Sequence, residues 1–152
     1  MTQAQTQKTL YHQDLVAWLD DTASKLKQRQ FEDIDIDSLI EEIEGLAGRD
    51  RRELKNRLVV LLSHLLKRLY VNLPNDYQGW ESTIREQRRQ LTDLLEQSPS
   101  LREYWIEIFP LAWKRAFSEI RDEYPQSQLP DEWQFSDEIN ALLSEKVWEN
   151  HN

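Results

Sequence analysis

Cysteine is absent from this chain of 152 residues, and glycine occurs only three times. Without cysteine the chain has neither disulfide bonds nor thiolate metal sites. The scarcity of glycine, together with the lack of short alternating runs of β-branched residues, disfavours a β-sheet. The longest apolar run is Leu58–Leu62, far shorter than the roughly 20 residues that a membrane-spanning helix needs. We therefore expect no membrane association.

Basic residues are outnumbered: the chain has 19 Lys and Arg residues and 28 Asp and Glu residues, which gives a net charge of -9. A field of that sign repels nucleic acid, so a nucleic-acid partner is not expected. Residues 1–9 are polar and contain no apolar signal core, which favours a cytoplasmic protein.

The middle third of the chain has helical periodicity. From Asp37 to Tyr70, leucine and isoleucine recur mostly three or four residues apart. The spacing predicts one long central helix with a kink, or a pair of helices, because Gly45 and Gly48 offer a place for a bend. Asp37 or Ser38 is the predicted N-cap. The apolar positions are Leu39, Ile43, Leu46, Leu54, Leu58, Leu61, Leu65 and Leu69.

Helical spacing continues on both sides of this stretch. A first helix is predicted from about Gln13 to Gln28, and further helices follow Gly79, Pro99 and Ser136, with Pro110 expected to kink or divide the one after Pro99. Residues 1–9 lack periodic apolar residues and are predicted to be a disordered arm. The predicted fold is all-α: a single compact bundle of five or six helices over residues 10–150.

The chain also resembles an uncharacterised bacterial family known as domain of unknown function 29. The resemblance covers about Leu10 to Trp148 and is carried by the order and spacing of short segments. The segments are Leu10-Tyr11 with Asp14 and Trp18, Asp37 to Glu44, Leu61 to Lys67, Trp80, Thr83 to Arg88, and Ser98-Pro99-Ser100-Leu101. It implies a compact helical bacterial protein, and it implies no activity and no site residues.

Three polar residues of the central stretch lie on one stripe. Asp50, Arg57 and His64 are seven residues apart, so each steps only about 20° around a helix axis. We interpret them as part of a buried polar network that fixes the register of neighbouring helices. Arg88, at a core position of a later helix, is predicted to join it by pairing with Asp50 or Glu44.

A catalytic alternative uses two of the same residues. The spacing Arg57-x6-His64 resembles the arginine and histidine signature of the small helical nucleases called HEPN domains, in which the motif faces a dimer cleft. Histidine would serve as the general acid or base, and arginine would stabilise phosphate charge. This alternative is a metal-independent RNase.

A second alternative is a carboxylate metal-binding bundle. It would use the acidic run Glu32, Asp33, Asp35, Asp37, Glu41, Glu42 and Glu44. Dinuclear sites in helical bundles use Glu-x-x-His pairs, and the sequence has none. Acids near a helix N-terminus are also stabilised by the helix dipole, so a solvated face explains the run.

The sequence therefore favours a non-catalytic module without a cofactor that binds another protein or associates with itself. It contains no glycine-rich phosphate loop, metal-ligand spacing or nucleophile motif. The second half also has three tryptophans, Trp113, Trp133 and Trp148, which would mark a partner surface if they were exposed.

Overall fold

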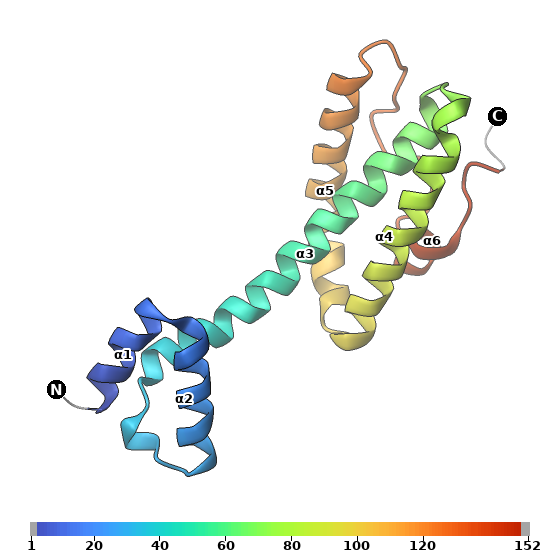
Figure 1. Ribbon diagram of the computed structural model, residues 1–152. Coiled ribbons are helices and arrows are strands. Elements are labelled where there is room, and N and C mark those ends of the chain that lie inside the picture. Colours follow the sequence, from blue (N-terminus) through green and yellow to red (C-terminus); the bar gives the residue numbers. More distant parts are fainter. Residues whose placement is uncertain (1–2, 150–152) are drawn as a thin grey trace. The chain divides into compact units, whose positions relative to one another are not determined.

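The computed structural model describes residues 3–149, which form six α-helices and two short 3₁₀ helices, with no strand in that range. Figure 1 shows the helices in chain order. The predictions of an all-α fold, of five or six helices and of a long central helix are confirmed. The α-helices are α1 Gln3–Gln13, α2 Leu15–Lys27, α3 Ile36–Tyr70, α4 Tyr77–Gln97, α5 Leu101–Glu123 and α6 Ile139–Ser144. The 3₁₀ helices are η1 Phe31–Asp33 and η2 Pro74–Asp76.

The chain divides into two compact units, residues 1–49 and residues 50–152, and the boundary lies inside α3. That the chain forms one domain over residues 10–150, the last of which lies outside the described range, stays a prediction. Within the described residues the buried apolar side chains fall into two groups. One is the small set Trp18 and Ile34, and the other is a large cluster that begins at Leu54. Each unit is described by itself below.

The N-terminal unit begins with a helix where the sequence analysis expected a disordered arm. Helix α1 covers Gln3–Gln13, while the part of that expectation for residues 1 and 2 lies outside the described residues. A buried polar side chain connects this helix to the rest of the unit. Gln7 Oε1 accepts from the backbone N–H of Asp35, and its Nε2 donates to Asp21 Oδ2 at 3.2 Å. Apolar periodicity gives no signal for such a helix.

Helix α3 is one helix from Ile36 to Tyr70, so the predicted alternative of a helix pair is not found. Its cap is Asp35, not Asp37 or Ser38. The carboxylate of Asp35 accepts from the backbone N–H of Ser38 at 3.3 Å and from the Ser38 hydroxyl. Ser38 is thus the third residue of the helix, where an N-cap side chain finds its donor.

The C-terminal unit contains the large core. The second half of α3 packs with α4 and α5, and α6 lies against α4 (Figure 1). Leucines three or four residues apart on α3 are fully buried, as the periodicity predicts; they are Leu54, Leu58, Leu61 and Leu65. Pro110 lies inside α5 without ending it. Trp113, Trp133 and Trp148 are partly buried against this core and do not form an exposed patch.

Candidate functional site

The N-terminal unit leaves most of its apolar side chains uncovered. Nine large apolar residues there are between 41% and 69% exposed, whereas only Trp18 and Ile34 are buried among the apolar residues from position 3 to 49. We call these nine the N-terminal apolar surface. They are Leu15, Val16, Leu19, Leu26, Phe31, Ile36, Ile40, Ile43 and Leu46.

Helical geometry explains why α3 contributes a continuous part of this surface. Ile36, Ile40 and Ile43 follow each other at spacings of four and three residues, so they form one stripe along the helix. Ser38 and Asp35 are buried and lie on a different side of the helix axis. The polar contacts of the unit therefore occupy one side of α3, and its apolar stripe faces solvent.

Helix α2 shows the same division. Trp18 and Thr22, four residues apart, are buried, while Leu15, Leu19 and Leu26 share an adjacent stripe that is exposed. Tyr11 packs against Trp18 with ring centroids 4.6 Å apart, and its hydroxyl donates to Glu42 Oε2 at 3.2 Å. Both an aromatic contact and side-chain hydrogen bonds therefore connect α1 with α2 and α3.

The predicted stripe of Asp50, Arg57 and His64 is half-buried on α3, and within the described residues no ion pair or hydrogen bond joins any two of the three. Arg57 Nε donates to Glu53 Oε1 at 2.9 Å, and its Nη1 donates to Gln87 Oε1 on α4 at 3.3 Å. Arg57 therefore links α3 to α4.

His64 is bound to its own helix. Its Nδ1 lies 2.8 Å from the carbonyl oxygen of Val60, which accepts only, so Nδ1 carries the proton. Burial lowers the pKa of His64, and the nearby Lys67 acts in the same direction, while the backbone hydrogen bond and Glu123 oppose the shift. His64 is neutral at neutral pH as a result.

Arg88 departs from its predicted pairing. It is buried, but its guanidinium donates to backbone carbonyls: Nε to Leu142 O at 2.8 Å and Nη2 to Glu145 O at 2.7 Å. Backbone carbonyl groups take the place of the expected carboxylate. They lie at the end of α6, where the last carbonyl groups of a helix lack partners within the helix. Glu44, the other predicted partner, is exposed in the N-terminal unit.

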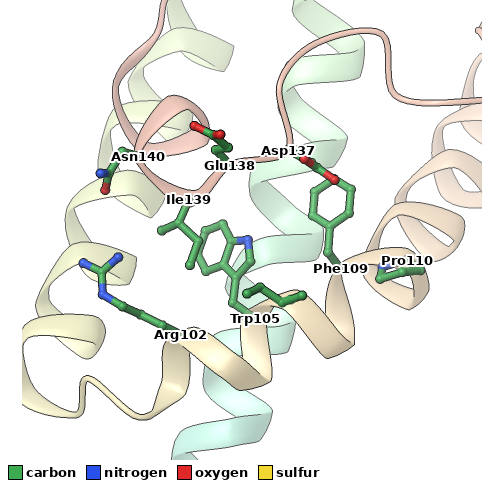
Figure 2. Close-up of a pocket in the computed structure, with 9 residues that line it drawn as sticks. Arg102, Trp105, Phe109, Pro110, Asp137, Glu138, Ile139 and Asn140 are labelled. Atoms are coloured by element: carbon green, nitrogen blue, oxygen red, sulfur yellow. The ribbon is translucent and has the colours of Figure 1, made fainter.

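The C-terminal unit contains a pocket between the first half of α5 and the start of α6, with a cavity volume of about 490 Å³. Figure 2 shows the indole of Trp105 at its centre, with Ile139 on one side and the Phe109 ring on the other. Three charged side chains, Arg102, Asp137 and Glu138, line it as well. Periodicity along the sequence gives no signal for this pocket, because the lining residues come from two segments about 30 residues apart.

Within residues 3–149, no three His, Asp or Glu side chains come together in a way that could hold a metal ion. The same residues include no helix that is both long and apolar enough to cross a bilayer.

A class of protein follows from these observations: an all-helical protein that leaves many large apolar side chains of its N-terminal unit exposed. The chain belongs to the family described as "Domain of unknown function DUF29", whose model matches residues 10–148, so the resemblance seen in the sequence is confirmed. Comparisons with curated proteins and with solved structures gave no match.

Proposed function

We propose that this protein is a self-associating interaction module and that two copies meet through the N-terminal apolar surface. The observation that carries the proposal is the uncovered stripe of Ile36, Ile40 and Ile43 on α3, with the similar stripe on α2. Exposed apolar stripes on helices mark contact sites when a partner covers them.

The area supports a stable contact. Nine large side chains that are about half exposed amount to on the order of 800 Å², which is one partner's share of a standard protein–protein interface. Covering this surface would also supply what the unit lacks internally, since its described residues bury only two large apolar side chains and so form a small core.

A second copy suits the surface better than an unlike partner. Most dimers of identical chains are two-fold symmetric, so each copy presents the same patch to the other, and apolar helix stripes pack against their own kind. The charges around the patch have both signs. Lys27 and Arg29 at the end of α2, and Glu41 and Glu44 on α3, are exposed and form no ion pair within residues 3–149. They are therefore available to pair between copies.

The test is the molar mass in solution by size exclusion with light scattering, at about 100 μM protein, well above the micromolar or tighter Kd expected of an interface of this size. The wild type should be a dimer. The double variant Ile40→Gln, Ile43→Gln should be a monomer with an unchanged circular dichroism spectrum, because both side chains are exposed in one copy.

The matched control is Leu111→Gln, an equally exposed apolar residue on α5, which should stay dimeric. A wild type that is monomeric at this concentration would contradict self-association. A dimer that survives the double variant would place the contact elsewhere on the chain.

A further inference from the structure

We propose that a pocket between α4 and the end of α6 binds a small phosphomonoester through its phosphate group. This α4–α6 pocket has a volume of about 340 Å³, and Arg88 lines it. The other lining residues are Glu81, Arg85, Leu143, Ser144, Lys146 and Trp148. All of them belong to the C-terminal unit, so the site is independent of the proposed self-association.

Arg88 is a buried cation without a carboxylate partner. It is 9% exposed and forms no ion pair within residues 3–149. A buried charge is normally paired, because removing a charge from water costs free energy that an opposite charge offsets. Burial lowers the pKa of Arg88, and the nearby charge of Glu145 opposes this shift without cancelling it. The carbonyl groups at the end of α6 supply only partial negative charge. An anionic ligand would supply the rest.

Arg88 also has hydrogen-bond donors to spare. A guanidinium has five N–H groups. Nε donates to the carbonyl oxygen of Leu142 and Nη2 to that of Glu145. Nη1 has no hydrogen-bond partner in the described residues, and it is not among the atoms there that are both unpartnered and closed to solvent. Its N–H groups are therefore accessible in a side chain that lines the pocket, and they can donate to oxygen atoms of a ligand.

The charges that line the pocket are opposite in sign to the charge of the whole chain. Three cations and one carboxylate line it, a balance of +2, whereas the chain has a net charge of -9. The carboxylate, Glu81, is already paired with Arg68 at 3.7 Å. Arg85 forms no ion pair within the described residues, and Lys146 has only an exposed pair with Glu149 at 3.7 Å, which is a weak interaction. The pocket therefore attracts an anion.

A phosphomonoester is the anion that matches both the charge and the walls. Its phosphate group carries close to two negative charges, whereas a carboxylate or a sulfate ester carries one. Its oxygen atoms also suit the planar donor geometry of a guanidinium. Arg88 Cζ lies 5.8 Å from the centre of the Trp148 ring, so a phosphate bound to Arg88 places its organic group beside an aromatic wall. The cavity volume lies within the range of roughly 300 to 1,000 Å³ that small-ligand sites occupy.

The experiment is an NMR titration of the nitrogen-15-labelled full chain with phenyl phosphate, phenyl sulfate and inorganic phosphate, at about pH 8 so that the ester is doubly charged. Phenyl phosphate should shift the side-chain N–H signals of Trp148 and Arg88 and leave that of the buried Trp105 in place. It should bind roughly tenfold more tightly than the other two probes, because the sulfate has one charge fewer and the free ion lacks the ring.

Three outcomes would contradict the proposal. If phenyl phosphate leaves the Trp148 and Arg88 signals unshifted, the pocket is not the site. Equal affinity for phenyl phosphate and phenyl sulfate would mean that the pocket does not select a doubly charged group. Equal affinity for phenyl phosphate and inorganic phosphate would mean that the ligand is a free ion and not an ester.

Variants at the rim of the pocket test the role of its charge without replacing Arg88, whose loss is expected to weaken the attachment of α6. Arg85→Gln and Lys146→Gln remove exposed cations, so folding should not change, and each should weaken phenyl phosphate binding by roughly three- to tenfold. The control Arg102→Gln removes an exposed cation on α5 that does not line this pocket, and it should bind as the wild type does. Wild-type affinity in both rim variants, or an equal loss in the control, would overturn the proposal.

Discussion

Arg88 Nε donates to the carbonyl oxygen of Leu142 at 2.8 Å, although the two residues are 54 positions apart. A second bond from Arg88 Nη2 reaches Glu145 O at 2.7 Å, just after α6 ends at Ser144. One guanidinium therefore supplies donors to carbonyls that the end of a helix leaves unpaired, and it brings a positive charge to the negative end of the helix dipole. This contact fastens the short α6 to α4.

We expect Arg88→Met to lower the free energy of unfolding by about 2 to 4 kcal/mol, because the side chain keeps its bulk but leaves buried carbonyls without donors. Urea unfolding followed by circular dichroism measures the change. Arg85→Met, an exposed neighbour on α4, is the control and should change stability by no more than about 0.5 kcal/mol. Equal midpoints for the two variants would show that the Arg88 contact does not stabilise α6.

The sequence predicted the all-α class, the long α3 and the buried leucines from Leu54 onward, because a continuous apolar stripe with neighbours to cover it produces a clear period. The same stripe continues through Ile43 and Leu46, but there the side chains are exposed. Periodicity identifies an apolar face, but whether the same chain covers that face depends on tertiary packing.

Polar determinants were the least predictable part. The partner of Arg88 is a backbone carbonyl, and every residue type has one, so no sequence pattern identifies it. Helix α1 was missed for a similar reason, since Gln7 holds it through hydrogen bonds. Whether the predicted site residues Arg57 and His64 have a functional role stays a prediction.

Gln7 provides a test of how the N-terminal unit is held. Its side chain is buried and bridges Asp21 on α2 and the backbone of Asp35 at the start of α3. Gln7→Leu has similar volume but leaves the Asp35 N–H unpaired, which should cost about 1 to 3 kcal/mol. Amide hydrogen exchange should accelerate in α1 and in the first turns of α3.

The C-terminal unit provides the internal reference for that experiment, since exchange in α4 and α5 should stay unchanged. The exposed Gln13→Leu is the matched control and should exchange as the wild type does. Unchanged exchange in the Gln7 variant would mean that other contacts hold α1 in place.

The RNase alternative can be tested directly. A nuclease needs an arginine free to meet a phosphate, but Arg57 donates to Glu53 and Gln87. We therefore expect RNA to remain intact after incubation with purified protein, as judged on denaturing gels. Cleavage by the wild type that both Arg57→Ala and His64→Ala abolish would contradict this expectation and support the nuclease.

His64 should make the stability of the C-terminal unit depend on pH. Burial holds its pKa in the folded protein below the ordinary value of 6.5, so below that pH the unfolded chain binds a proton that the folded chain does not. The free energy of unfolding is therefore unaffected by His64 above pH 6.5. It decreases as the pH falls from 6.5 towards the lowered pKa. His64→Asn removes the titration, so the variant should lose less stability than the wild type over that interval. Urea unfolding at several pH values measures the free energy of unfolding against pH for the wild type and for His64→Asn. The exposed His12→Asn is the control. Parallel slopes for the wild type and His64→Asn would show that His64 takes up its proton equally in both states, against the burial that the structure shows.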